Sequence, residues 1–199
     1  MPLFTAGHGT AGRDQLLRLL QQAGIRALVD VRTAPGSRRN PDVARETMAR
    51  WLAESGIDYR WEPRLGGWRK PPASSPDTCL HNRPFAGYAA HMRTPEFLDA
   101  VHELLEGAAQ CPTTVMCAES LWWRCHRRLI ADFVVLSAGM PVLHVMPGGR
   151  VEPHRPAGAA RLREDGLLVY DRTDPWPAPQ PPLTGPPAGP APETLRSGW

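Results

Sequence analysis

Hydrophobic residues along the chain form short runs that alternate with longer amphipathic stretches. The short runs predict buried strands at residues 3–6, 25–31, 57–61, 113–116 and 141–146. In four stretches between or beside them, apolar residues recur every three or four positions. This spacing predicts helices at residues 16–23, 41–55, 94–108 and 129–139. The alternation predicts a single three-layer α/β domain, Rossmann-like or flavodoxin-like, with a mostly parallel sheet of about five strands and helices on both faces.

Segments rich in proline and glycine interrupt this pattern in two places. Residues 63–84 contain too many helix and strand breakers for regular structure to be expected. Residues 167–170 are apolar and predict either one more short strand or a docking segment. Beyond them prolines dominate, so we expect the folded domain to span residues 1–171 and residues 172–199 to be a disordered tail. A recognition peptide of polyproline character is the alternative for this tail.

The composition of the 199 residues narrows the class of protein. No apolar run approaches the roughly 20 residues that cross a bilayer, and the first residues lack the features of a signal peptide. We therefore expect a cytoplasmic protein with four reduced cysteines and no membrane partner. The net charge of +3 does not by itself indicate nucleic-acid binding. Lys70 is the only lysine among 23 basic residues, which indicates either codon bias or a use of arginine for anion recognition.

The segment from Cys117 to Arg128 carries the strongest indication of a site. Cys117 and Glu119 follow the fourth predicted strand, and Cys125, His126 and Arg127 precede the helix after it. Ligands bind at the carboxyl ends of strands in open α/β sheets. A helix start also favours anions and lowers the pKa of a thiol. The sequence therefore predicts a reactive thiol here, with catalytic candidates Cys117, Glu119, Cys125 and His126.

Polar residues also follow the first two predicted strands. His8 lies between two glycines after the first strand, where it is either a proton carrier or part of a tight turn. Asp30 and Arg32 end the second strand, and Ser37 and Arg38 follow in a loop. These four residues either bind a phosphate or carboxylate, or form a structural Asp30–Arg32 pair beside a solvated loop.

Two further segments supply candidates for ligand binding. Gly66-Gly67-Trp68-Arg69 is a glycine-rich loop whose spacing fits neither a Walker A nor a dinucleotide motif. Trp68 could stack on a planar ligand and Arg69 could meet its charge, or the loop could be a turn held by tryptophan packing. Tyr88 and His91 are three residues apart and could share one helical face. Tyr88 is then either a ligand contact or an ordinary amphipathic position.

The spacing of the cysteines excludes several common sites. The separation of eight positions from Cys117 to Cys125 matches no short zinc motif, and no CxxC pair exists, so we predict no metal and no cofactor. A zinc site of Cys117, Glu119, Cys125 and His126 stays open as an alternative. A thiolate-phosphatase loop needs an arginine six positions after its cysteine. Trp123 stands there, which excludes that loop.

In combination these motifs resemble the family of the domain of unknown function 488 (DUF488), over residues 3–170. The segments that carry the resemblance are Thr5-Ala6-Gly7-His8, Asp30-Val31-Arg32, Leu65-Gly66-Gly67-Trp68-Arg69, Phe85-Ala86-Gly87-Tyr88, Met116-Cys117-Ala118-Glu119 and Cys125-His126-Arg127. The resemblance implies a fold but no particular reaction, because the family has no settled activity. Trp122 departs from the family pattern, in which many members carry proline.

The leading hypothesis is an enzyme that acts on an anionic, nucleotide-like small molecule. Cys117 or Cys125 would be the thiol, His8 or His126 the proton carrier, and Glu119 an acid, base or orienting group. The ligand would be held by residues from all the segments above, namely Asp30, Arg32, Ser37, Arg38, Arg69, Tyr88 and Arg127. The alternatives are a non-catalytic module that binds a nucleotide or nucleic acid, and a zinc-dependent site. The sequence predicts no oligomeric state.

Overall fold

The computed structural model describes residues 1–172, and residues 173–199, which make up nearly all of the predicted tail, lie outside the described residues. Its main sheet has six strands in the order β3-β2-β4-β1-β5-β6. Their bounds are β1 (Leu3–Gly7), β2 (Ala27–Asp30), β3 (Asp58–Trp61), β4 (Thr113–Cys117), β5 (Val142–Val145) and β6 (Val151–Pro153). The first five pair in parallel, and β6 pairs antiparallel with β5. The prediction of a Rossmann-like α/β fold with a mostly parallel sheet is confirmed.

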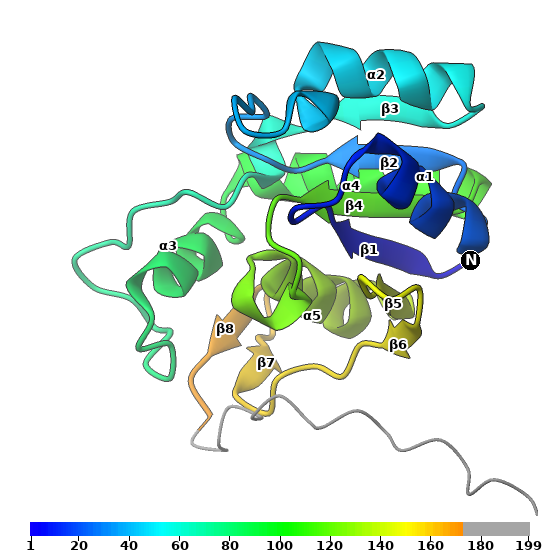
Figure 1. Ribbon diagram of the computed structural model, residues 1–199. Coiled ribbons are helices and arrows are strands. Elements are labelled where there is room, and N and C mark those ends of the chain that lie inside the picture. The colour runs from blue at the N-terminus through cyan, green and yellow to red at the C-terminus, as the bar shows by residue number, and fades with distance from the viewer. Residues whose placement is uncertain (173–199) are drawn as a thin grey trace, which may run out of the picture.

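Helices cover both faces of this sheet, so the domain has three layers. They are α1 (Arg13–Gln22), α2 (Arg45–Glu54), α3 (Arg83–His91), α4 (Pro95–Gln110) and α5 (Arg127–Ala138). Figure 1 shows α1 in front of the sheet and α4 behind it. Alternate residues of one strand point to opposite faces, so Leu28 packs with α1 and α2 while Val29 packs with α3, α4 and α5. The fold thus buries two separate cores.

The helix ends follow the signals present in the sequence. The Thr94 side chain accepts a hydrogen bond from the Phe97 amide at the start of α4, with Pro95 in the first turn. Gly139 ends α5 in the left-handed conformation, with φ of 63°. None of the helices in residues 1–172 is long and apolar enough to cross a membrane.

The structure corrects the prediction for residues 63–84. The segment contains a short 3-10 helix, η2 (Pro63–Leu65), and α3 begins at Arg83. Both starts are capped, because Glu62 accepts from the Arg64 amide and Asn82 accepts from the Phe85 amide. A proline stands in the first turn of each helix, where a backbone N–H would have no partner within the helix. Side-chain capping therefore outweighs the composition of the segment.

The other elements differ little from the predicted ones. The helix predicted over residues 41–55 divides into a 3-10 helix, η1 (Pro41–Val43), and α2. The strand alternative for residues 167–170 is confirmed, since β8 (Leu168–Tyr170) pairs with β7 (Ala160–Leu162) in a second sheet. Neither β6 nor β7 was predicted, because each has only three residues and at least one exposed position.

The parallel register brings the ends of three strands together. Gly7 of β1 lies opposite Cys117 of β4, and Asp30 of β2 lies opposite Met116. Hydrogen bonds continue past the strands, because the His8 amide donates to the Cys117 carbonyl at 3.1 Å. Residues that follow β1, β2 and β4 therefore share one edge of the sheet, as expected from the strand order.

Candidate functional site

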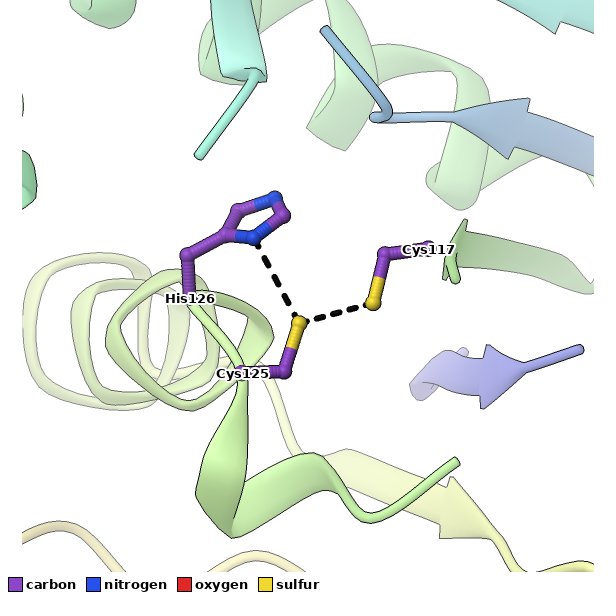
Figure 2. A group of neighbouring side chains, drawn as sticks. All are labelled: Cys117, Cys125 and His126. Carbon is purple, nitrogen blue, oxygen red and sulfur yellow. Dashed lines mark hydrogen bonds between the residues drawn. The ribbon is translucent and has the colours of Figure 1, made fainter. Parts of the chain in front are cut away.

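The two cysteines on either side of the loop after β4 are in contact. Cys117 is the last residue of β4, and Cys125 lies just before α5, so their sulfur atoms approach from two different elements (Figure 2). The Sγ–Sγ distance is 2.7 Å, and Nδ1 of His126 lies 3.4 Å from the Cys125 sulfur. Both thiols are buried, with exposed fractions of 3% and 6%. Together Cys117, Cys125 and His126 form what we call the thiol cluster.

Glycine makes the tight return of this loop possible. A Cβ atom on Gly7 would lie 1.9 Å from the carbonyl oxygen of Glu119, so the loop crosses the end of β1 at a distance that only glycine permits. Gly67 is placed similarly, since a Cβ there would meet the His126 ring at 2.4 Å. The glycines of two separate segments thus let the chain close around the thiol cluster.

Arg127 joins the thiol cluster to the sheet. Its buried guanidinium donates from Nε to the Cys117 sulfur at 3.1 Å and from Nη1 to the Thr5 hydroxyl at 3.3 Å. Its Nη2 donates to the Glu119 carbonyl at 2.5 Å. A fixed positive charge therefore lies against the sulfur pair, where little water competes with it.

The environment separates the acidities of the two thiols. Burial opposes ionisation of Cys125, but the hydrogen bond from Cys117 and the charge and N–H groups of Arg127 outweigh it and lower the pKa to about 6. Burial and the hydrogen bond to Cys125 raise the pKa of Cys117 well above its usual value. Burial also lowers the pKa of His126. Near neutral pH the cluster thus carries one thiolate on Cys125, one thiol on Cys117 and a neutral imidazole.

The thiol cluster opens into a cavity of about 300 Å³. Four segments line it besides the cluster, contributing Arg32, Thr33, Ala34, Gly67, Trp68, Pro84, Phe85, Ala118, Glu119 and Arg124. Trp68 is 86% exposed, the most exposed large hydrophobic side chain of the described residues. Arg124 is exposed as well. The cavity therefore combines buried sulfur atoms at one wall with an aromatic ring and a cation open to solvent.

Asp30 and Arg32 form a buried ion pair at this edge. The guanidinium donates to the carboxylate from Nε at 2.8 Å and from Nη2 at 2.5 Å, and the Tyr59 hydroxyl donates to the same carboxylate. The structural alternative for this pair is thus present. Arg32 nevertheless lines the cavity, with Nη1 directed toward His8 Nε2 at 3.3 Å. His8 lies behind it and is not among the lining residues, and burial followed by the Arg32 charge lowers its pKa.

Of the seven predicted ligand contacts, only Arg32 is among the residues that line the cavity. Four of the other six lie in loops and a helix around it. The Ser37 hydroxyl accepts from the Asn40 amide, and Arg38 is exposed on the same loop. Arg69 donates to three backbone carbonyls between residues 63 and 66, which fixes the glycine-rich loop. The buried Tyr88 hydroxyl donates to the Leu65 carbonyl at 2.9 Å. Arg69 and Tyr88 thus support the wall from behind.

A second buried polar cluster lies on the other side of Arg127 and was not predicted. It runs from Thr5 through His144 and His154 to Asp132, with successive side-chain distances of 2.7, 2.9 and 2.9 Å. Trp122 stacks on the His144 ring with a centroid distance of 4.1 Å. We call these four polar residues the histidine cluster. Asp132 was the available signal, since it is a carboxylate within an apolar helical run.

The histidine cluster is a continuous chain of hydrogen bonds. The Asp132 carboxylate accepts from His154 Nε2, from the Ala157 amide and from the Tyr170 hydroxyl. His144 Nε2 pairs with His154 Nδ1, and the Thr5 hydroxyl pairs with His144 Nδ1. Burial, His154 and Arg127 lower the pKa of His144 to about 2, which keeps it neutral. The cluster therefore connects the Arg127 cation to the Asp132 anion.

The comparisons with known proteins agree with the resemblance seen in the motifs. The family model described as "Domain of unknown function DUF488" matches residues 13–134. No curated protein and no solved structure matches the chain. The matched span runs from α1 into α5 and contains Asp30, Cys117 and Cys125. The chain belongs to the DUF488 family.

Proposed function

We propose that the chain is an enzyme that uses the Cys125 thiolate as a nucleophile on an anionic small molecule bound in the cavity. The observation that carries the proposal is the contact between the two sulfur atoms beside the buried Arg127 guanidinium. A buried cysteine with an apolar surrounding is inert, whereas one held beside a cation and a thiol donor is activated. Cys125 has both of these partners.

The neighbouring residues have separate roles in this proposal. Cys117 donates its S–H to the Cys125 thiolate, and Arg127 stabilises the charge without leaving its hydrogen bonds to the sheet. His126 is neutral and lies within reach of the Cys125 sulfur, so it can accept or return a proton there. Glu119 lines the cavity and accepts from the Leu121 amide, which orients its carboxylate.

The cavity wall supports an anionic ligand with a flat part. Arg124 is exposed and lines the cavity, so it is the arginine best placed to meet a phosphate or carboxylate. Trp68 and Phe85 line the same cavity and offer faces for stacking. A nucleotide-like molecule combines these two features.

Alkylation with iodoacetamide across a range of pH tests the proposal directly. We expect Cys125 to be labelled first, with a rate that reaches half its maximum near pH 6, because the thiolate is the reacting form. Cys125→Ser should remove this fast phase, and Cys111→Ser should keep it. If the wild type shows no fast phase and its alkylation rate rises only above about pH 8.5, the proposal is contradicted.

A thermal-shift screen against anionic metabolites then identifies the ligand. A ligand at 100 times its Kd stabilises the folded state by about 2.7 kcal/mol. Binding that protects Cys125 from alkylation, followed by turnover, supports an enzyme. Protection without turnover of any bound ligand would favour the non-catalytic binding module instead.

One observation favours a zinc-dependent site as a second candidate. Ligand atoms of Cys117, Cys125 and His126 all lie within 4.8 Å of one another, and two cysteines with one histidine leave a coordination position open for substrate. Two thiolates on one zinc ion would stand about 3.7 Å apart, so this sulfur pair would have to open by about 1 Å. Elemental analysis of the purified protein tests this candidate. One equivalent of zinc, lost in Cys125→Ser, would support it.

A further inference from the structure

We propose that Cys117 and Cys125 are a reversible dithiol–disulfide couple and that the site reduces an anionic low-molecular-weight disulfide. The proposal rests on the function above, because Cys125 is the attacking thiolate in both. It adds a second reacting sulfur, a substrate class and a transfer of two electrons.

The first support is the placement of the two sulfur atoms. They lie 2.7 Å apart, and a disulfide bond is about 2.05 Å long, so closing the bond requires a movement of less than about 1 Å. Cys117 ends a central strand and Cys125 begins the approach to α5, so both come from packed elements that already lie side by side (Figure 2). No part of the fold has to open to bring the two thiols together.

The second support is the difference between their surroundings. Cys125 lies 3.4 Å from His126 Nδ1, which can take its proton, and 2.7 Å from the Cys117 sulfur, so it is the thiol placed for attack on a substrate. Cys117 faces the Arg127 guanidinium at 3.1 Å, which stabilises the thiolate that Cys117 must form before it reacts in turn. A thiol in contact with the attacking sulfur and beside a cation is well placed to resolve a mixed disulfide.

The reaction can be written with all atoms accounted for. The Cys125 thiolate attacks one sulfur of a disulfide R–S–S–R, the S–S bond breaks, and R–S⁻ leaves with the electron pair and takes a proton from solvent. Cys117 then passes its proton to His126, and the new thiolate attacks the Cys125 sulfur of the mixed disulfide. The second R–S⁻ leaves and takes that proton. The cysteines lose two electrons, the substrate gains them, and a dithiol reductant reverses the change.

Burial and charge define the substrate. Both sulfur atoms are nearly inaccessible, so the disulfide of a folded protein cannot reach them, whereas a small molecule can enter the cavity of about 300 Å³. Three charged residues line the cavity. Arg32 is paired with Asp30, and the partly buried Glu119 carboxylate accepts from the Leu121 amide, so Arg124 is the exposed cation of the wall. An exposed cation beside a cavity attracts anions and repels cations. An anionic disulfide is therefore favoured over a cationic disulfide of similar size.

The test uses the full chain, reduced and desalted, with 3,3'-dithiodipropionate as the anionic probe and cystamine as the cationic probe of similar size. Trypsin cleaves after Arg93, Arg124 and Arg127, so the new disulfide would join the tripeptide Cys125-His126-Arg127 to peptide 94–124. Mass spectrometry of this linked pair measures the reaction. We expect it to form about tenfold faster with dithiodipropionate than with cystamine.

Single variants separate the two steps. Cys117→Ser should stop after the first step and accumulate one mercaptopropionate per chain on Cys125. Cys125→Ser should form neither product. Cys111→Ser is the matched control, because Cys111 lies on the same peptide as Cys117 and outside the cluster. It should form the linked pair at the wild-type rate.

Three outcomes would overturn the redox proposal. One is fast alkylation of Cys125 without a linked pair, which would leave the proposed nucleophile in place. Another is equal rates with the two probes, which would remove the anionic substrate class. The third is a linked pair that forms only with a hydroperoxide, with no mixed disulfide in Cys117→Ser. Slow alkylation of Cys125 would instead contradict the proposed function itself.

Discussion

The two polar clusters on either side of Arg127 both contain buried histidine and differ in how fully its hydrogen bonds are satisfied. In the histidine cluster, each imidazole nitrogen of His144 and His154 has a partner within 3.0 Å. In the thiol cluster, His126 Nε2 is buried near the backbone of Val31 and makes no hydrogen bond of good geometry within the described part of the chain. Only the thiol cluster lines the cavity.

This difference distinguishes a supporting network from a reacting one. A buried network whose members are all satisfied holds one conformation, and each part removed leaves another part unpaired. An incompletely satisfied group beside a cavity is instead free to change its proton or its partner. We therefore expect changes in the histidine cluster to affect stability and changes in the thiol cluster to affect reactivity.

The largest effect is expected for Asp132→Ala. It removes the acceptor of three buried donors, each of which costs about 1–3 kcal/mol when left unpaired, so the free energy of unfolding should fall by more than about 3 kcal/mol. Urea unfolding measures this change. Asp171→Ala is the matched control, because its ion pair with Arg161 is partly open to solvent, and it should cost less than about 1 kcal/mol. Equal losses would show that Asp132 contributes no more to stability than a partly exposed ion pair.

The next effect separates the clusters by pH. Since folding lowers the pKa of His144 to about 2, the unfolded chain binds a proton below about pH 6.5 that the folded chain does not. The free energy of unfolding should thus fall as pH decreases from 6.5, by up to about 1.4 kcal/mol per pH unit for this group. Unfolding of His144→Gln at pH 6.5 and pH 5 should show a smaller slope than the wild type. Parallel slopes would contradict the assigned neutral imidazole.

The thiol cluster should change the free energy of unfolding between about pH 6 and 8.5, above the range in which His144 changes it. Folding lowers the pKa of Cys125 to about 6, so the unfolded chain holds the thiol proton between about pH 6 and 8.5 and the folded chain does not. The contribution of Cys125 to stability therefore grows as pH rises through this window and is lost as pH falls toward 6. The stability difference between the wild type and Cys125→Ser should increase by about 1–2 kcal/mol from pH 6 to pH 8. A difference independent of pH would show that Cys125 does not ionise on folding.

Arg127→Lys tests the residue that the two clusters share. Lysine keeps the charge but cannot donate at once to the Cys117 sulfur, the Thr5 hydroxyl and the Glu119 carbonyl. The pKa of Cys125 should move back toward its usual value, and alkylation at pH 7 should slow by about tenfold. Arg124→Lys, on the exposed edge of the cavity, should keep the wild-type rate with the neutral reagent iodoacetamide. An unchanged rate in Arg127→Lys would mean that Arg127 only holds the fold.

The smallest effect concerns the exposed rim of the cavity. Trp68→Ala should leave the free energy of unfolding within about 0.5 kcal/mol, because this side chain is 86% exposed. It should slow the reaction with dithionitrobenzoate, an aromatic and anionic disulfide, by a few fold through lost stacking. The rate with iodoacetamide should not change. Equal slowing with both reagents would indicate a disturbed loop in place of a lost contact.

The sheet and most helices could be predicted from the sequence because each depends on a local pattern. The apolar run of β4 and the Thr94 cap of α4 depend only on residues a few positions away in the sequence. The start of α3 was missed because a single side chain, Asn82, outweighs the prolines around it. The strand order then placed His8, Asp30 and Cys117 at one edge, which follows from parallel pairing.

The contacts inside the site depend on the path of a loop, and sequence spacing does not describe that path. The separation of eight positions from Cys117 to Cys125 fits no common motif, yet the loop returns so that their sulfur atoms touch. The sequence places Arg127 beside an anion site, but its partners lie on β1, on β4 and in the loop. His144 and His154 were overlooked because each stands on a separate element and resembles an ordinary core residue.

Gly7 offers a way to change the shape of the site without changing its chemistry. Because a methyl group at this position would collide with the Glu119 carbonyl, Gly7→Ala acts as a wedge under the loop that carries Cys125. All the reactive groups are retained, and only their spacing shifts. The reactivity of Cys125 in Gly7→Ala would thus show how much depends on the reactive groups being present and how much on their exact placement.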